Sequence, residues 1–300
     1  MDISTLRNNR NAMLNKIVAQ VENGGETQSY EDTRFWKPER DKAGNASATI
    51  RFLNAVGTDE LPWVKYFSHG FKGPTGRWYI ENSLTTLGKG DPVSELNMKL
   101  WNSTTDDKSP ARKQARDQKR KLNYVSNILV VNDPKHPENN GKVFLFKYGK
   151  KIHDKIIDKA RPTFEDEEPV NVFDYWAGCN FKLRMKKVDG YPNYDSSEWE
   201  SPSPVASSDE AILEIAKQQY ELSEFVSEKN FKSYDALKKK LDMVLNGAPV
   251  QERAEEVELV SRPAPSPGPV KESIPGYTSK PSVDDDDEDM MSYFKSIADD

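Results

Sequence analysis

Positively charged side chains alternate with aromatic ones in three stretches of this 300-residue sequence. A cation neutralises a phosphate and releases its counterions, while an exposed ring stacks on a nucleobase for about 1–3 kcal/mol whichever base it meets. The combination predicts a surface for single-stranded nucleic acid, since duplex readers need polar side chains aimed at base edges. The stretches are Lys119-Arg120-Lys121 before Tyr124; Phe144, Phe146 and Tyr148 around Lys147, followed by Lys150-Lys151; and Lys186-Lys187 before Tyr191 and Tyr194.

Each of these features also has a simpler interpretation. For Phe144 core packing is favoured, and for Phe146 the pattern supports core and contact equally. Tyr191 and Tyr194 lie in the turn-rich segment 190–195, where large rings are less often core, and this favours stacking. The cations of 119–121, taken alone, are also compatible with a solvated face.

Motifs of the common enzyme classes are absent from the sequence. It holds no P-loop, no dinucleotide fingerprint, no nucleophile elbow and no His-Glu-x-x-His zinc motif, so we expect no enzymatic activity.

The single cysteine, Cys179, cannot form an internal disulfide, and with His69, His136 and His153 it cannot supply a Cys-rich zinc cluster. No apolar run approaches the roughly 18 residues of a membrane span.

The formal net charge of −6 combines two segments of opposite sign. Residues 284–300 carry a net charge of −7, whereas residues 110–161 carry +9. This asymmetry predicts a polyanion-binding surface in mid-chain and a tail that is solvated or competes for that surface. Apolar residues among the acidic ones favour a partner-binding motif over a plain solubilising extension. The candidate tail residues are Asp284, Asp285, Asp286, Asp287, Glu288, Asp289, Tyr293 and Phe294.

A mainly β core with flanking helices must position these residues. Apolar residues alternate at 48–52 and 181–185, and a continuous apolar run covers 128–131, so residues 46–195 are predicted to be mainly strands. Five or so short strands with long loops fit a Greek-key barrel of the OB type. Helical spacing follows the predicted caps Ser208 and Ser233.

Composition divides the chain into four parts. The Pro-rich linker cannot bury enough apolar surface to offset its ordering entropy, and we expect the acidic tail to be disordered as well. The parts are an amphipathic N-terminal arm at 1–25; a core at 26–247 with an inserted loop subdomain at about 62–110 and helices at about 207–247; the linker at 248–283; and the tail at 284–300.

Four segments of the core match a known sequence pattern. They are residues 45–53, His69-Gly70-Phe71, residues 77–81 and, most closely, residues 119–156. They resemble the single-stranded DNA-binding proteins of T-even-like bacteriophages, and the resemblance spans roughly residues 40–247. It implies an OB-fold core, an N-terminal arm for self-association along DNA and an acidic C-terminal tail that recruits replication and recombination proteins.

The resemblance also implies which side chains contact DNA. The arm residues expected to act in self-association are Ser4, Thr5, Arg7 and Arg10. His153 stands where the family has a tryptophan and is left out of the set. The DNA contacts that the resemblance implies are Lys119, Arg120, Lys121, Tyr124, Phe146, Tyr191 and Tyr194, with Arg51 and Trp101. The pattern of cations and aromatic residues adds Lys147, Lys150 and Lys151.

One implied feature of the family is missing from the sequence. The type member binds structural zinc through one His and three Cys, but here only His69 is kept. Ser83 stands at the first Cys position, and Asp91-Pro92-Val93-Ser94 replaces the Cys pair, so we expect no metal and no cofactor. Residues 82–110 must then be ordered by packing of Leu84, Leu96, Leu100 and Trp101, or be mobile without DNA.

We therefore expect a protein that coats and protects single-stranded DNA in phage DNA replication, recombination and repair, in the host-cell cytoplasm. Its expected partners are single-stranded DNA, further copies of itself bound cooperatively, and phage replication and recombination proteins; we expect no membrane partner. Two alternatives stay open. In the first, the chain is an interaction adaptor whose basic β core binds an acidic protein. In the second, the same basic surface binds RNA and the chain is a translational regulator.

Overall fold

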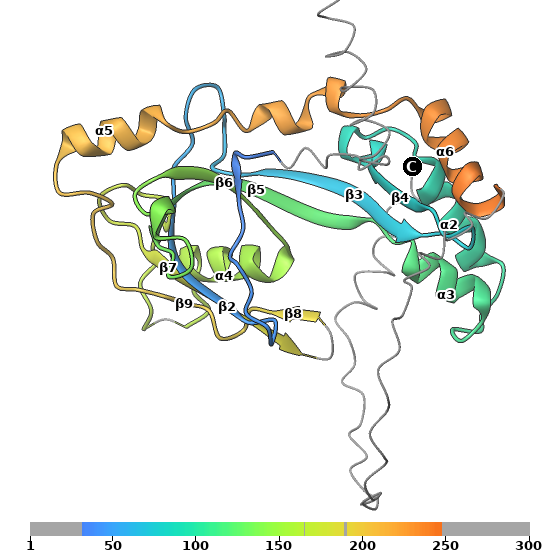
Figure 1. Ribbon diagram of the computed structural model, residues 1–300, viewed down its shortest axis with the longest axis horizontal. Coiled ribbons are helices and arrows are strands. Elements are labelled where there is room, and N and C mark those ends of the chain that lie inside the picture. The colour runs from blue at the N-terminus through green and yellow to red at the C-terminus, as the bar shows by residue number, and fades with distance from the viewer. Residues whose placement is uncertain (1–31, 165, 189–190, 248–300) are drawn as a thin grey trace, which may run out of the picture. The chain divides into compact units, whose positions relative to one another are not determined.

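The computed structural model describes residues 32–164, 166–188 and 191–247. Contacts among them define two compact units (Figure 1). The first unit comprises residues 32–65 and 122–226, and the second comprises residues 66–121 and 227–247. The predicted arm, linker and tail lie outside the described residues.

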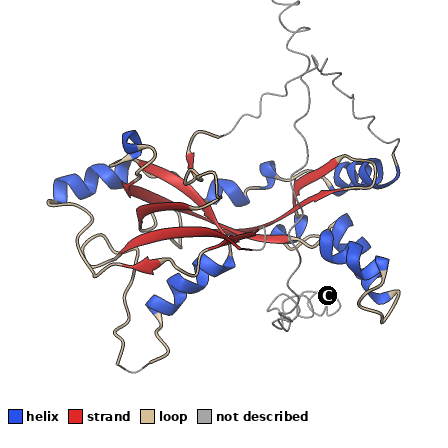
Figure 2. Cartoon of the chain, turned by 60° about the horizontal axis from the view of Figure 1, so that its bottom comes forward, coloured by secondary structure: helices blue, strands red, loops and turns tan. Residues whose placement is uncertain are grey.

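A mainly antiparallel sheet forms the centre of the first unit (Figure 2). The strand order is β1-β6-β5-β2-β7-β8, and β9 pairs with β7. β1 runs parallel to β6, and the other pairs within this unit are antiparallel. The strands are β1 (Phe35–Trp36), β2 (Ala46–Phe52), β5 (Lys121–Asn132), β6 (Val143–Tyr148), β7 (Asn180–Val188), β8 (Tyr191–Asn193) and β9 (Glu198–Trp199).

The strand β5 carries the continuous apolar run seen in the sequence. Every residue from Asn123 to Val130 is buried, because both faces of the strand are covered. Ile128 pairs with Phe52 on β2 and with Phe144 on β6. Burying a side chain of this size stabilises the fold by about 1.5–3 kcal/mol. The predicted mainly β core with helices is confirmed.

Helices complete the first unit, and one of them contradicts the prediction that residues 46–195 are mainly strands. The helix α4 (Lys150–Ala160) buries Ile152 and Ile156, which lie one turn apart on the same face. The helix α5 (Asp209–Lys217) begins as predicted at Ser208, whose hydroxyl accepts the Ala211 amide at 3.3 Å. Short 3₁₀ turns η2 (Pro137–Asn139) and η3 (Ser223–Val226) complete the connections.

The second unit packs a two-stranded hairpin against helices. The strands β3 and β4 pair antiparallel with His69 opposite Glu81, and their turn holds Gly76 at a φ of 79°. The helix α6 packs on α2 and β4. The elements are β3 (Val64–Lys72), β4 (Trp78–Asn82), η1 (Leu84–Leu87), α2 (Pro92–Asn102), α3 (Pro110–Asp117), η4 (Glu228–Asn230) and α6 (Tyr234–Asn246).

Apolar packing orders the segment 82–110 within this unit. Leu84 and Leu96 join a core around Phe71, Tyr79 and Val93, together with the buried face of α6. Trp101 and Leu100 form a second cluster with Ala115. It belongs to the predicted loop subdomain at about 62–110, but η1 and α2 make much of it helical.

Candidate nucleic-acid interface

The basic run 119–121 links the end of α3 to the start of β5. Lys121 is exposed, while Lys119 and Arg120 are half-buried. The Arg120 guanidinium lies 4.0 Å from the centroid of the Phe67 ring, a cation–π contact that holds the arginine in place. The run thus combines one exposed charge with two that are partly buried within the second unit.

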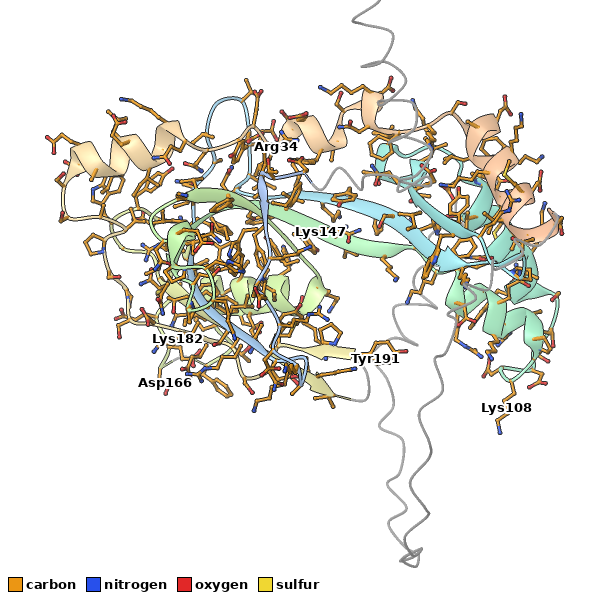
Figure 3. The ribbon with its side chains drawn as sticks, in the orientation of Figure 1. Arg34, Lys108, Lys147, Asp166, Lys182 and Tyr191 are labelled. Atoms are coloured by element: carbon orange, nitrogen blue, oxygen red, sulfur yellow. The ribbon has the colours of Figure 1, made fainter. Side chains whose placement is uncertain are left out.

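The first unit exposes a second group of cations on β6 and α4. Lys147 is exposed between buried Phe146 and Tyr148, as strand alternation requires (Figure 3). Lys150 and Lys151 are exposed in the first turn of α4. Lys150 Nζ lies 2.9 Å from an Asp154 carboxylate oxygen, a surface pair worth little in water. These ammonium groups satisfy the exposure that a phosphate-binding role requires.

Tyr191 is the predicted ring with an open face. It lies on β8, its side chain is 76% exposed, and it points away from the sheet edge (Figure 3). Its register partner is Val188, and the exposed Lys186 and Lys187 pair with the next two residues of β8. Tyr194 differs, because its ring packs against the core and burial raises the pKa of its phenol, an effect that Arg40 opposes.

The sequence is similar to known proteins over most of its length. The family described as gp32 DNA binding protein like matches residues 44–245. The single-stranded DNA-binding protein of Enterobacteria phage T4 is 40% identical over 240 residues, which cover 78% of each chain. That of Enterobacteria phage T2 is 40% identical over 225 residues, or 73% of this chain and 72% of the relative. The chain belongs to the gp32-like DNA-binding protein family.

Within this gp32-like chain, Tyr124 and Phe146 belong to a buried column of rings. Tyr124 is 7% exposed and stacks on Tyr148 with ring centroids 5.6 Å apart. Phe146 is 4% exposed and lies between Tyr148 at 5.6 Å and Trp36 at 5.7 Å. The expectation that Phe146 presents its ring to DNA is therefore wrong, because both of its faces are occupied by core side chains. Tyr124 has little surface left for a base.

Arg51 and Trp101 are also corrected by their surroundings. Arg51 is fully buried, and its Nη2 donates to the backbone carbonyls of Asp174 and Ser203, each at 2.8 Å. Burial lowers the pKa of this guanidinium, which serves as a link between loops and does not reach solvent. Trp101 is 9% exposed, and the Arg112 guanidinium covers its ring at 4.4 Å. Neither side chain is available to a DNA strand.

The zinc ligand positions of the family hold a different network in this chain. His69 Nδ1 donates to the Gln118 carbonyl at 3.0 Å, since a carbonyl only accepts. Its Nε2 lies 3.2 Å from Asp91 Oδ1, a close contact that is not a well-aligned hydrogen bond. The Asp91 carboxylate also accepts the amides of Leu84, Val93 and Ser94 at 3.0–3.1 Å.

This donor set does not fit a structural zinc ion. Two neutral hydroxyls, Ser83 and Ser94, stand where thiolates are needed, and Ser83 Oγ is hydrogen-bonded to Thr85 at 3.0 Å. The described residues contain no cluster of three or more His, Cys, Asp and Glu suited to a metal. Burial of Asp91 opposes its ionisation, but the close contact with His69 and the backbone amides of Ser94 and Leu84 outweigh it and lower the pKa to about 2.

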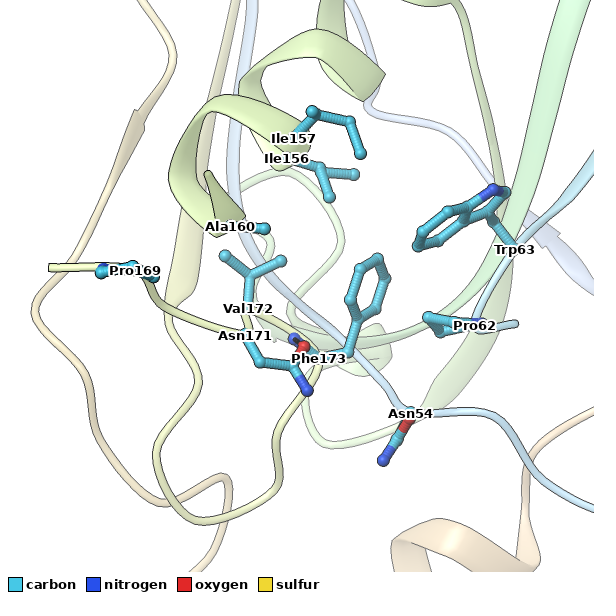
Figure 4. Close-up of a pocket in the computed structure, with 10 residues that line it drawn as sticks. All are labelled: Asn54, Pro62, Trp63, Ile156, Ile157, Ala160, Pro169, Asn171, Val172 and Phe173. Carbon is cyan, nitrogen blue, oxygen red and sulfur yellow. Dashed lines mark hydrogen bonds between the residues drawn. The ribbon is translucent and has the colours of Figure 1, made fainter. Parts of the chain in front are cut away.

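Two aromatic side chains of the first unit lie outside the predicted set: Trp63 was not considered, and His153 was left out. Trp63 and His153 are half-buried, and Trp63 lines a cavity of about 440 Å³ together with Ile156, Ile157 and Phe173 (Figure 4). His153 stacks on Tyr124, which lies 29 positions earlier in the sequence, so no local pattern signals the contact.

Two predicted site groups fall on residues that the structure does not describe. They are the arm residues Ser4, Thr5, Arg7 and Arg10, and the tail residues 284–289, Tyr293 and Phe294. Within the described ranges, no helix is both long and apolar enough to span a membrane.

Proposed function

We propose that this chain binds single-stranded DNA without sequence preference and coats it during phage DNA replication, recombination and repair. The observation that carries the proposal is the exposed cations of the first unit, Lys147, Lys150 and Lys151, together with the open ring of Tyr191 beside Lys186 and Lys187. Its relatives in phages T4 and T2 are named single-stranded DNA-binding proteins, which agrees with this assignment.

The physical mechanism uses two contributions that are the same for every base. Each lysine that contacts a phosphate displaces condensed counterions, so the affinity falls as salt rises, by a logarithmic slope of about −0.7 per contact for single strands. Tyr191 adds base stacking, which depends on a π face and not on a hydrogen-bonding edge. Neither contribution involves bond making or breaking, so the chain acts as a binding protein and not as an enzyme.

The antiparallel order of the first unit supports an OB-type barrel as its architecture. β5 is long and buried on both faces and pairs with β2 and β6, while β2 pairs with β7. Five-stranded Greek-key barrels of this kind bind oligonucleotides across one face and its loops. Lys147 on β6 and Tyr191 on the hairpin with β7 are suited to such a face.

The termini extend the proposal to protein partners. The arm at 1–25, with Ser4, Thr5, Arg7 and Arg10, associates with further copies along the strand, and the acidic tail at 284–300 recruits replication and recombination proteins. The tail's net charge of −7 also makes it a competitor of DNA for the basic surface, since both are polyanions.

The His69–Asp91 pair takes the structural place of zinc in this chain. It joins β3, η1, the start of α2 and the end of α3 through a single buried carboxylate and imidazole. A metal-free second unit follows from this, and the zinc content of purified protein measures it. One equivalent of tightly held zinc per chain contradicts it.

A salt-series titration with oligo-dT tests the DNA-binding proposal, using two matched variants. Lys150 and Lys151 are adjacent exposed lysines on α4, and Lys238 and Lys239 are adjacent exposed lysines on α6. Reversing the first pair to Glu should weaken binding. It should also make the slope of log affinity against log salt shallower by about 1.4, because each of the two lost phosphate contacts contributes about 0.7. Reversing the second pair should change neither. Wild-type protein that fails to bind at low salt refutes the function, and equal effects of the two pairs refute the site.

A further inference from the structure

His153 occupies an unusual position for a histidine on a helix. Its ring stacks face to face on Tyr124 with centroids 3.9 Å apart and planes inclined by 13°. The Trp63 ring meets it edge-on at 5.4 Å and 82°. The side chain is half-buried, so solvent still reaches part of the imidazole. The two ring contacts fix the plane of the imidazole while the residue keeps part of its surface in contact with solvent.

The charges around His153 are mostly positive. On its own helix, Lys150 is a nearby cation and Asp154 a nearby anion, and these two form an ion pair at 2.9 Å. Lys65, at the start of β3, adds a second cation, and the β5 neighbour is the phenol of Tyr124. Burial lowers the pKa of His153; the charge of Asp154 opposes this, and the charges of Lys65 and Lys150 add to it. The imidazole is therefore neutral in the free protein at pH 7.

A phosphate bound beside Lys65 and Lys150 raises the pKa of His153. It offsets the positive charges of the two lysines, which disfavour protonation of the imidazole, and its own negative charge favours the protonated ring. Among the groups around this position, His153 is the one whose ordinary titration range is near neutral pH. A proton taken up on DNA binding is therefore taken up by its imidazole.

We propose that His153 is a DNA-contacting side chain that takes up a proton as a phosphate of the bound strand settles beside Lys65 and Lys150, so that single-stranded DNA binds more tightly as the pH falls below neutral. The inference rests on the proposed function. By linkage, protonation strengthens DNA binding by the same factor as DNA strengthens protonation, and one pKa unit of difference corresponds to a tenfold change in affinity. The gain begins as the pH falls through the pKa of the bound state and levels off below that of the free state.

The other two histidines do not share this environment, and one supplies a matched control. His69 is fully buried against Asp91. His136 lies half-buried in the first unit, and its Nε2 and Nδ1 lie 2.6 Å and 3.0 Å from Glu39 and Glu138. Hydrogen bonds to these carboxylates raise the pKa of His136, so it is already partly protonated before DNA arrives. A substitution at His136 removes a titrating imidazole but not the proposed coupling.

The test measures the affinity of full-length protein for oligo-dT between about pH 5.5 and 8 at constant ionic strength. For wild type and His136→Gln we expect affinity to rise roughly three- to tenfold toward acid pH. His153→Phe, which keeps a ring on Tyr124 but cannot titrate, should flatten the profile, and so should His153→Gln. The same pH dependence in His153→Phe and wild type overturns the inference, whereas no binding by wild type at any pH overturns the proposed function instead.

A second measurement removes any dependence on variant folding. The imidazole proton resonance of His153 in wild-type protein, titrated by NMR with and without oligo-dT, should report a higher pKa in the complex. An equal or lower pKa in the complex refutes the coupling.

Discussion

Replacing Asp91 tests whether one buried carboxylate organises the second unit. Asp91→Asn keeps an acceptor for the α2 amides but removes the charge opposite His69. The depression of the Asp91 pKa from 3.8 to about 2 converts to roughly 2–3 kcal/mol of stabilisation at neutral pH. Asp91→Ala also loses the helix cap and leaves the Leu84 amide without its acceptor. We expect losses of about 2–3 kcal/mol for Asn and about 3–5 kcal/mol for Ala, the range for breaking a buried pair.

Guanidinium unfolding combined with hydrogen exchange provides the assay. Exchange at the amides of Leu84, Val93 and Ser94 reports the second unit directly, since these three groups donate to Asp91. The control is Asp106→Ala, because Asp106 is exposed and its carboxylate accepts a local turn amide, that of Lys108 at 3.0 Å; we expect a change within about 0.5 kcal/mol. A loss below about 1 kcal/mol in Asp91→Ala refutes the reasoning.

The pH dependence of the same variants follows from the sign of the shift. A carboxyl group with a depressed pKa in the folded state contributes stability that is fully present above its unfolded value of 3.8. That contribution disappears as the pH falls toward about 2. Wild type and Asp91→Asn should therefore converge in stability across this acid range, and a constant difference contradicts the stabilising role of the ionised Asp91 carboxylate.

Three further predictions concern the proposed interface and its competitor. Tyr191→Ala should weaken oligo-dT binding by about 1–3 kcal/mol with an unchanged salt slope, and unchanged affinity contradicts the stacking role. Phe146→Leu should lower the free energy of unfolding by about 1 kcal/mol while leaving affinity intact; a loss of affinity like that of Tyr191→Ala contradicts its place in the core. Truncation after Gly247 removes the linker and acidic tail and should tighten DNA binding at low salt in the same titration, whereas equal affinities refute competition by the tail.

Several elements were predictable because their signals are local. Ser208 and Ser233 cap α5 and α6 as the sequence indicates, each accepting an amide three residues on. The helix α2 has similar local signals, since Asp91 is its N-cap and Pro92 its first residue, but these two residues also stand where the family has zinc ligands and their loop. The helix α4 was missed because its buried Ile152 and Ile156 are surrounded by charges.

The candidate site was harder to predict, because exposure depends on what covers the sheet from elsewhere. The alternation of residues along β6 predicts that Lys147 lies on the face opposite Phe146 and Tyr148, and Lys147 is exposed. The alternation does not show whether the face that carries Phe146 contacts solvent or is covered by other core side chains. Trp36 and Phe52, which are remote in the sequence, fill the space beside Phe146. Arg51 was misplaced for the same reason, since its carbonyl partners Asp174 and Ser203 come from distant loops. The exposure of Tyr191 agrees with its turn-rich sequence, since this edge strand leaves its ring open to solvent.

Because most of the predicted aromatic rings are buried, base stacking should contribute less to DNA affinity than lysine–phosphate attraction. Tyr191 alone among the predicted rings of the described residues has a widely exposed face, so stacking contributes about 1–3 kcal/mol through one base. The first unit exposes five lysines in the proposed site: Lys147, Lys150, Lys151, Lys186 and Lys187. If each meets one phosphate, the salt slope is about −3.5, and a fourfold rise in salt lowers affinity roughly a hundredfold. The core rings then act indirectly: they hold the cations in place, and electrostatic attraction supplies most of the affinity.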